Sequence, residues 1–137
     1  MGKSAGKRAP NVQPVKAIAA ALITALGMKL FFVDFMISEG RSMIPAIMPG
    51  SLLLINRAAY GLRVPWTERY VLRWKQPSAG DIVVFKTPLG ETAVKRCASA
   101  GEEGFFALGD NTGESCDSRS YGFIRNDSIL GKVVGIR

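Results

Sequence analysis

Histidine is absent from this sequence of 137 residues, and cysteine occurs only twice. Without histidine, neither a Ser-His-Asp triad nor a Cys-His pair can form, and most zinc sites lose a usual ligand. Cys97 and Cys116 alone cannot make a four-ligand metal site. The loop that begins at Asp110 has acidic positions like those of a calcium-binding loop, but its sixth position is Ser115, where the sharp turn requires glycine. We therefore expect neither a metal nor a cofactor.

Acidic residues are missing from the first 16 positions. That segment instead carries four bases: Lys3, Lys7, Arg8 and Lys16. More than half of the formal net charge of +7 therefore lies in an N-terminal tail, so the chain does not have a strongly basic domain. Hydrophobic residues make up 47% of the chain, which is enough to bury a core, and the length fits one domain with an appendage.

The segment 15–37 is the most apolar part of the chain. A helix that spans a bilayer needs about 20 apolar residues, and residues 17–33 contain a single charge, on Lys29. Three interpretations are open: a transmembrane anchor, a cleavable signal peptide, or an ordinary buried helix. No small-residue cleavage site follows the apolar stretch, which favours retention of the segment. Lys29 and Asp34 would be costly inside a bilayer unless they lie near its edge.

We predict three parts: a basic cytoplasmic tail at 1–14, a transmembrane anchor at 15–37 and a folded domain at 38–137. Because the bases precede the apolar segment, the positive-inside tendency places the N-terminus in the cytoplasm. Everything after residue 37 would then lie on the extracytoplasmic side of a membrane. Such an anchor makes membrane lipid an expected partner.

The chain beyond residue 50 contains short runs of β-branched and aromatic residues bounded by Gly, Pro, Asp, Asn or Ser. This pattern is typical of strands and turns, and long amphipathic helical periodicity is absent. We expect five strands, at 51–57, 81–86, 92–97, 104–108 and 129–137. The predicted fold class is therefore mainly β.

Bases and aromatic residues alternate between positions 57 and 76. The bases are Arg57, Arg63, Arg69, Arg73 and Lys75, and the aromatic residues are Tyr60, Trp66, Tyr70 and Trp74. Such a mixture suits a membrane-water interface, and it also suits single-stranded nucleic acid, on whose bases aromatic rings stack. A domain outside the cytoplasm would rarely meet nucleic acid, so we favour the interface and expect no nucleic acid partner. A merely solvated basic edge is the third interpretation.

Ser42 lies in the stretch EGRSMIP, residues 39–45, soon after the apolar segment. Pro45 makes the residue before it extended or turned, and serine is common in turns, so a turn serine is the simplest interpretation. If Ser42 is a nucleophile, its base has to be a lysine, a carboxylate or the N-terminal amine. A lysine made neutral by burial is an established solution.

Lys95 is the lysine best suited to that role. In a strand with side chains alternating between faces, Ala93, Lys95 and Cys97 lie on the same face. These small, weakly polar neighbours would desolvate the ammonium group and lower the lysine pKa. Lys86 instead ends its strand before a proline-containing turn, where it can reach water. A lysine that merely reaches water from a strand edge remains the alternative for Lys95.

Five blocks of the sequence occur in a recognisable order: SMIP, AAYG, AGDIVVFKTP, AVKR and ALGDNTGESCDSRSYGFI. Together they resemble the sequence boxes of bacterial type I signal peptidases, the membrane-anchored Ser/Lys proteases that remove signal peptides. The resemblance covers about residues 39–137, and its last block is long and specific. It implies that the substrates are preproteins, cut after the Ala-X-Ala-like ends of their signal peptides.

The resemblance also implies roles for individual residues. Ser42 is expected to be the nucleophile and Lys95 the general base. Ser115 would orient the lysine through a hydrogen bond, while Asp117 and Arg119 would hold the last block in place. The implied fold is a mainly β, antiparallel two-sheet catalytic domain behind one N-terminal transmembrane helix, in the bacterial cytoplasmic membrane.

Substrate contacts follow from the same resemblance. An extended substrate would pair with the strands that carry Val84 and Val94. The residues expected to keep the substrate pockets shallow are Met43, Val84, Phe85 and Val94. Gly40 stands where some relatives have a serine that contributes to the oxyanion hole, so the backbone N–H of Ser42 would do more of that work. The segment that joins Lys95 to the last block is shorter than in relatives, which leaves the contacts of the missing insertion in doubt.

The two cysteines permit a disulfide hypothesis. Cys97 lies two residues after Lys95, and Cys116 follows Ser115. If Ser115 contacts Lys95, the two thiols are close enough to bridge in an extracytoplasmic compartment. Two free thiols are the alternative.

Three other functions stay open. The first is a related Ser/Lys processing peptidase of a conjugation or pilus system, which the sequence does not separate from a signal peptidase. The second is a self-cleaving repressor-type protease, which should carry a helical DNA-binding domain where this chain has its apolar segment. The third is a non-catalytic, membrane-tethered β module.

Overall fold

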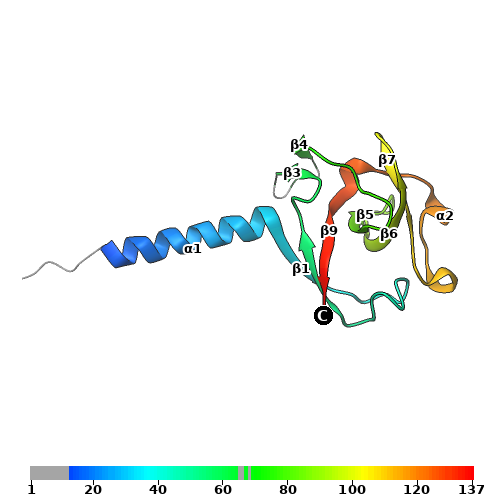
Figure 1. The fold of residues 1–137 in the computed structure, drawn as a ribbon, viewed down its shortest axis with the longest axis horizontal. Helices are drawn as coiled ribbons and strands as arrows, with labels where there is room; N and C mark the ends of the chain where they lie inside the picture. Colours follow the sequence, from blue (N-terminus) through cyan, green and yellow to red (C-terminus); the bar gives the residue numbers. More distant parts are fainter. Residues whose placement is uncertain (1–12, 65–66, 68) are drawn as a thin grey trace, which may run out of the picture.

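The computed structural model describes residues 13–64, 67 and 69–137, and within them one long helix, α1 (Gln13–Phe32), precedes a β domain. The strands of that domain are β1 (Val33–Ile37), β2 (Leu52–Asn56), β3 (Gly61–Arg63), β4 (Tyr70–Arg73), β5 (Ile82–Lys86), β6 (Thr92–Ala100), β7 (Gly104–Leu108), β8 (Ile124–Arg125) and β9 (Ile129–Ile136). Its short helical turns are η1 (Thr112–Glu114), α2 (Ser118–Tyr121) and η2 (Asn126–Ser128). Figure 1 shows α1 projecting from the rounded β domain.

The main sheet has seven strands in the order β1-β2-β9-β5-β6-β7-β8, and its neighbouring strands are antiparallel. The last strand, β9, lies between β2 and β5 and so joins the two halves of the sheet. β3 and β4 form a separate antiparallel hairpin. Strands β1, β2 and β6 therefore belong to one sheet, although some 50 residues separate the β1–β2 loop from β6 in sequence.

Two hydrophobic clusters fill the β domain. One contains Tyr60, Val83, Phe85, Cys97, Phe105, Ala107, Ile124 and Ile129, and the other contains Met43, Ile47, Leu53, Ile55, Val84 and Val133. Successive side chains of a strand point to opposite faces, so Val83 and Phe85 join the first cluster while Val84 joins the second. β5 is therefore buried on both faces, which accounts for its uninterrupted run of apolar residues.

All five strands predicted from the sequence are present, as β2, β5, β6, β7 and β9. The prediction of a mainly β, antiparallel domain is therefore confirmed. The second sheet is only the β3–β4 hairpin, and β1, β3, β4 and β8 were not foreseen. All four lie at an edge of the main sheet or in the hairpin, where short strands leave a weak pattern in the sequence.

The segment of alternating bases and aromatic residues contributes to the fold. Arg63 is only 7% exposed and donates from Nη1 to the carbonyl oxygen of Ile129 at 2.7 Å. Tyr70 donates from its hydroxyl to the same oxygen at 3.0 Å, and Arg73 pairs with Asp127. Trp66 lies outside the described residues. At least Arg63 and Tyr70 therefore act as structural links between the hairpin and the main sheet.

Helix α1 ends at Phe32, and β1 follows without a loop. Residues 33–37, which the sequence prediction assigned to the apolar helical segment 15–37, pair with β2 from Val33↔Asn56 to Ile37↔Leu52. The alanine-rich part of the segment favours a helix, whereas VDFMI finds a partner strand and suits β structure. The predicted basic tail, 1–14, lies almost wholly outside the described residues.

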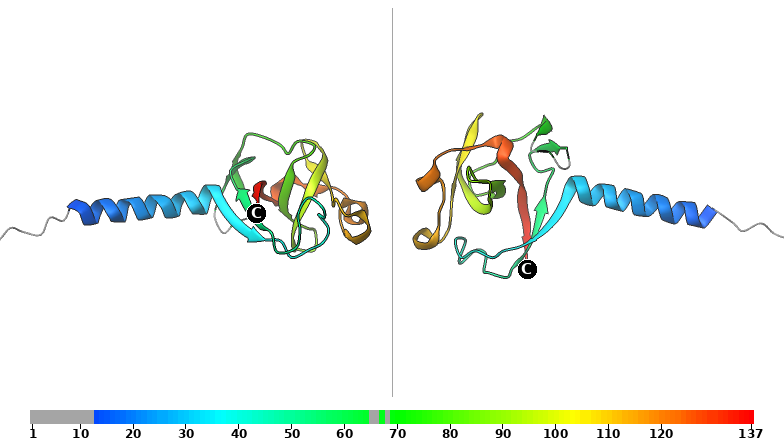
Figure 2. Two further views of the ribbon diagram at one scale, coloured as in Figure 1. Left: turned by 60° about the horizontal axis from the view of Figure 1, so that its bottom comes forward. Right: turned by 180° about the vertical axis from the view of Figure 1, so that it is seen from behind.

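The membrane prediction receives no support from helix length and hydropathy. Among the described residues, no helix is both long and apolar enough to cross a bilayer. Two further views show α1 leaving the β domain without packing on its sheets (Figure 2).

Candidate active site

Ser42 lies in the loop between β1 and β2, and apolar side chains fix this loop to the core. Met43 and Ile47 are 2% and 1% exposed, and both belong to the cluster that contains Val84. The loop also makes a helix-like turn, in which the amide of Ile47 donates to the carbonyl oxygen of Met43 at 2.9 Å. The position of Ser42 is therefore set by two buried neighbours in the chain.

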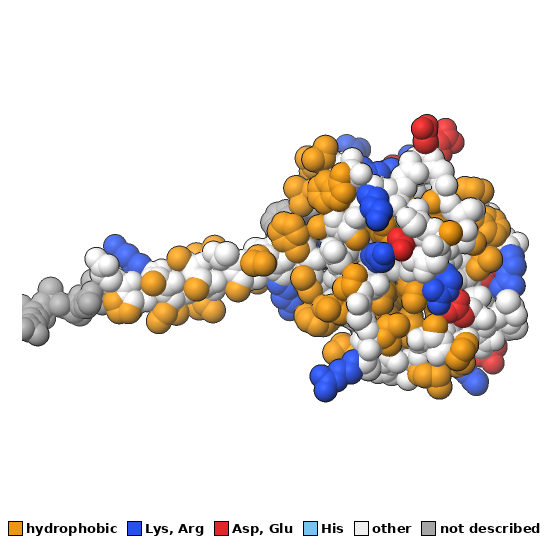
Figure 3. Space-filling view, viewed as in Figure 1, with side chains coloured by type: hydrophobic (Ala, Val, Ile, Leu, Met, Phe, Trp, Pro, Cys, Tyr) orange, Lys and Arg blue, Asp and Glu red, His pale blue; other side chains and the backbone are white. Residues whose placement is uncertain are grey.

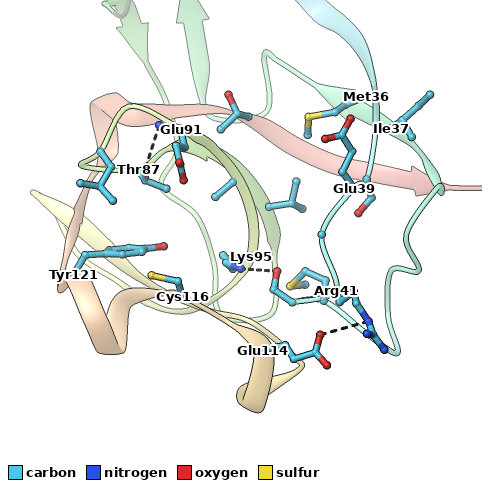
Figure 4. Close-up of a pocket in the computed structure, with 18 residues that line it drawn as sticks. Met36, Ile37, Glu39, Arg41, Thr87, Glu91, Lys95, Glu114, Cys116 and Tyr121 are labelled. Carbon is cyan, nitrogen blue, oxygen red and sulfur yellow. Dashed lines mark hydrogen bonds and ion pairs between the residues drawn. The ribbon is translucent and has the colours of Figure 1, made fainter.

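Lys95 lies on β6 and is 5% exposed. Its Nζ donates a hydrogen bond to Oγ of Ser42 at 2.5 Å, and Figure 4 shows this contact among the residues that line a pocket. Burial lowers the pKa of Lys95 below that of an ordinary lysine, although the nearby Asp117 carboxylate opposes this shift. Lys95 and Cys97 are both buried while Arg96 between them is partly exposed, which agrees with the period-2 pattern.

This pair of side chains has the composition of a nucleophile and its base. A lysine with a lowered pKa is more readily neutral, and a neutral amine can accept the hydroxyl proton of the serine beside it. Within the described residues the backbone N–H of Ser42 donates to no protein acceptor. It is thus free to donate to an oxyanion that forms at Ser42.

Asp117 is the centre of a buried polar cluster next to this pair. The carboxylate is 0% exposed and accepts hydrogen bonds from Nε and Nη2 of Arg119 at 2.9 and 2.7 Å. It also accepts from the amide of Gly109 at 2.8 Å and from the hydroxyl of Ser115 at 2.7 Å. The Arg119 guanidinium and these donors hold the pKa of Asp117 well below its usual range. The cluster therefore joins Gly109, Ser115 and Arg119 through one carboxylate. That Asp117 and Arg119 hold the last block in place for activity remains a prediction.

Gly109 and Asn111 connect this cluster to the nucleophile, and the sequence analysis missed both. The amide of Asn111 donates to the carbonyl oxygen of Ser42 at 2.9 Å, and its side chain donates to that of Arg41 at 3.1 Å. A methyl group on Gly109 would lie only 2.6 Å from the Ser42 carbonyl oxygen. In the sequence, these two residues could have been noticed only through their place in the last block, ALGDNTGESCDSRSYGFI.

Ser115 takes a different partner from the one predicted. Its hydroxyl donates to Asp117, and no hydrogen bond joins it to Lys95 in the part of the chain that the structure describes. The acceptor of that bond, Asp117, is near enough to Lys95 to act on its pKa. The orienting role of Ser115 remains a prediction.

A pocket of about 520 Å³ opens above Ser42 and Lys95. Of the residues predicted to contact substrate, Gly40, Met43 and Val94 line it. Val84 and Phe85 do not, because they are 1% and 0% exposed and belong to the two core clusters. Their assignment to the substrate pocket is therefore not supported by this structure, and the continuous burial of β5 explains why.

The cysteines are both free thiols. Cys97 is buried in the core, with its Sγ directed to the carbonyl oxygen of Ser99 at 3.6 Å. Cys116 is exposed at the pocket. The structure thus contains no disulfide between them, and the disulfide hypothesis is not supported.

Comparisons with known proteins show which family this chain is similar to. A family model described as "Signal peptidase, peptidase S26" matches residues 12–103 and 97–136. The chain is 29% identical to the signal peptidase I of Pseudomonas fluorescens over 123 residues, which are 88% of this chain and 40% of that protein. It is 35% identical to that of Pseudomonas aeruginosa over 74 residues, 53% of this chain and 26% of the relative. The signal peptidase I of Bacillus caldolyticus is 25% identical, and the alignment covers 85% of this chain and 84% of the relative.

The chain spans less than half the length of the Pseudomonas relatives. The residues that the family model matches nevertheless include both the Ser42 loop and β6, because they run from 12 to 136.

Proposed function

Because the chain belongs to the signal peptidase, peptidase S26 family, we propose that it is a serine endopeptidase that removes N-terminal signal peptides from secreted preproteins. The proposed substrates carry small residues, typically alanine, in an Ala-X-Ala-like site before the cleaved bond. The observation that carries the proposal is the 2.5 Å contact between Lys95 Nζ and Ser42 Oγ, among the residues that line a pocket.

The mechanism follows from that contact. Neutral Lys95 accepts the proton of Ser42, whose Oγ attacks the substrate carbonyl carbon. The backbone N–H of Ser42 donates to the oxyanion. Lys95 then passes the proton to the leaving amine, which gives an acyl-enzyme on Ser42. Water that loses a proton to Lys95 hydrolyses this ester and restores the serine.

We further propose that the protein works at a membrane, with lipid as its partner and the β domain on the extracytoplasmic side. Support comes from the apolar side chains exposed on and beside α1. On one face of β1 and β2, the exposed apolar residues are Val33, Phe35, Ile37 and Leu52, here called the apolar outer face. Figure 3 shows hydrophobic side chains along α1 and on the part of the β domain beside it. Contiguous exposed apolar surface is typical of interaction sites.

The test of the activity is cleavage of a preprotein with an Ala-X-Ala site by the detergent-solubilised full chain. Parent protein is compared with Ser42→Ala and Lys95→Ala. Lys86→Ala serves as the matched control, because Lys86 lies on the neighbouring strand and donates only to the Gly90 carbonyl oxygen at 3.4 Å. We expect cleavage by the parent and the control and loss in the other two, each with retained circular dichroism. Equal cleavage by all four proteins would overturn the assignment of Ser42 and Lys95.

The alternatives give different results in the same assay. A protein that ignores Ala-X-Ala preproteins but cuts a pilin or conjugation precursor is the related processing peptidase. A protein that cuts neither, under conditions where a relative is active, is the non-catalytic module.

A further inference from the structure

The pocket has a side that the Ser/Lys mechanism leaves unused. Ser42 and the loop before it form one wall, with Glu39 and Arg41 on its rim. Across Lys95, the opposite wall comes from the segment around α2 and contributes Cys116 and Tyr121. Figure 4 shows the Tyr121 ring with its hydroxyl directed toward Lys95 and the pocket interior.

The Tyr121 hydroxyl is an unsatisfied polar group. Its oxygen is buried, and it has no hydrogen-bond partner within the described residues. The ring itself is held by partial packing against the core cluster of Phe85 and Phe105. Buried polar groups in folded proteins are nearly always paired, and leaving one unpaired lowers stability. A group that is fixed, unpaired and aimed into a pocket requires a reason.

The chemical state of this hydroxyl is set by its surroundings. Burial, assisted by the negative charge of Asp117, raises the pKa of Tyr121 to about 12. The hydroxyl therefore keeps its proton throughout the pH range in which a lysine base operates and can donate a hydrogen bond. Lys95, in its working neutral form, is already engaged with Ser42. The partner of Tyr121 must then come from outside the chain.

An extended polypeptide supplies such a partner. Each residue of a substrate that enters the pocket brings a backbone carbonyl, which loses its water on binding and needs a new donor. We propose that Tyr121 is a substrate-binding residue, and that its hydroxyl donates to a main-chain carbonyl of the polypeptide lying between Lys95 and the α2 wall. This inference rests on the proposed peptidase function and adds a substrate contact to it.

Tyr121→Phe tests the contact by removing only the oxygen. If the hydroxyl binds substrate, the variant has a KM about 3- to 10-fold higher, the effect of one typical hydrogen bond, with kcat within about twofold of the parent. Because the same oxygen is unpaired in the free protein, its removal also raises the Tm, by about 2 °C or more. A higher Tm together with a higher KM is a combination that a purely structural tyrosine does not produce.

Tyr70→Phe is the matched control. This substitution also removes a tyrosine hydroxyl. In the parent, that hydroxyl donates to the Ile129 carbonyl oxygen, and Tyr70 does not line the pocket. We expect this variant to have a lower Tm and an unchanged KM.

Binding can also be followed without turnover through Cys116. In the folded protein only Cys116 is accessible to an alkylating reagent, because Cys97 is 1% exposed. In a Ser42→Ala background, an Ala-X-Ala peptide that fills the space between Lys95 and Tyr121 should slow alkylation of Cys116. Adding Tyr121→Phe should raise the peptide concentration needed for half-protection by about the same 3- to 10-fold.

The outcomes separate the two proposals. A parent that cleaves and a Tyr121→Phe variant with unchanged KM and unchanged half-protection would overturn the tyrosine contact while leaving the peptidase intact. A parent that neither cleaves the preprotein nor shows peptide protection of Cys116 overturns the peptidase proposal and the contact with it.

Discussion

At the scale of single residues, the burial of Lys95 predicts how the proposed activity depends on pH. Burial holds the lysine pKa below the ordinary 10.5, so the neutral base forms at a lower pH than for an exposed lysine. We expect kcat/KM to rise with pH and to level off before pH 10.5. The measurement is kcat/KM between pH 5 and 10 with a preprotein peptide. A flat profile, or a rise centred at 10.5, would contradict a buried lysine base.

The same burial has a thermodynamic consequence. A lysine whose pKa is lower in the folded state than in the unfolded chain destabilises the fold below that pKa, and stability returns as pH rises toward 10.5. Replacing Lys95 by methionine removes the desolvated amine but keeps most of the volume. We expect Lys95→Met to lose cleavage by at least about 1,000-fold and to have a higher Tm than the parent at pH 7. Calorimetry at pH 7 and pH 10 measures this, and the gain should shrink at the higher pH.

The sequence predicted residues of the site unevenly. Ser42 and Lys95, whose side chains are in contact, could be chosen as candidates because period 2 placed the lysine beside small residues and the blocks resembled a family. Val84 and Phe85 could not be judged, since an apolar residue in a strand looks the same whether it lines a pocket or fills a core. Tyr121 gave no signal, because an unpaired hydroxyl is a property of three-dimensional surroundings.

At the scale of elements, the contact between the end of β7 and the Ser42 loop is too close for a side chain. A Cβ on Gly109 would lie 2.6 Å from the Ser42 carbonyl oxygen and 2.5 Å from the Ser115 Cβ, so backbone must shift. We predict that Gly109→Ala displaces the nucleophile loop, lowers activity by at least about 10-fold and lowers stability by about 1–3 kcal/mol. Gly113→Ala is the control, because its Cβ would meet nothing within 4 Å.

Activity assays and urea unfolding of the two glycine variants decide this prediction. Equal activity and equal stability of Gly109→Ala and Gly113→Ala would contradict the prediction and show that the Ser42 loop tolerates the shift.

The elements were easier to predict than the residues of the site, but not uniformly. Strands with buried, β-branched positions, such as β5 and β9, gave clear signals. β1 did not, because VDFMI continues the apolar composition of α1 and becomes a strand only through pairing with β2. Pairing with another strand decides whether such a segment becomes helix or strand, and composition alone does not reveal that partner.

At the scale of the whole molecule, hydrophobic side chains are exposed along α1 and on the part of the β domain beside it (Figure 3), where the apolar outer face of β1 and β2 follows the helix in the chain. We predict that the full chain co-sediments with phosphatidylcholine vesicles, and that the double change Phe35→Ser and Ile37→Ser weakens this binding by about 10-fold. The two side chains are 54% and 61% exposed, so their loss should leave the core unchanged.

Phe123→Ser is the control for vesicle binding. Phe123 is 64% exposed and follows α2, on the side of the β domain away from α1. Equal vesicle binding by this control and the double variant would show that general apolar exposure, and not the outer face, is responsible.

The direct passage from α1 into β1 has a geometric consequence. β1 is paired with β2 along its whole length, and five residues of strand extend about 17 Å; Ser42 follows only a few residues later. A paired strand thus connects the helix to the loop that carries the nucleophile. Under the proposed function, a surface that held α1 would also set the distance of Ser42 from that surface, and a peptide bond would have to be presented at that distance to be cut. Bond selection is then partly a matter of position, measured from the helix, and does not depend on side-chain recognition alone.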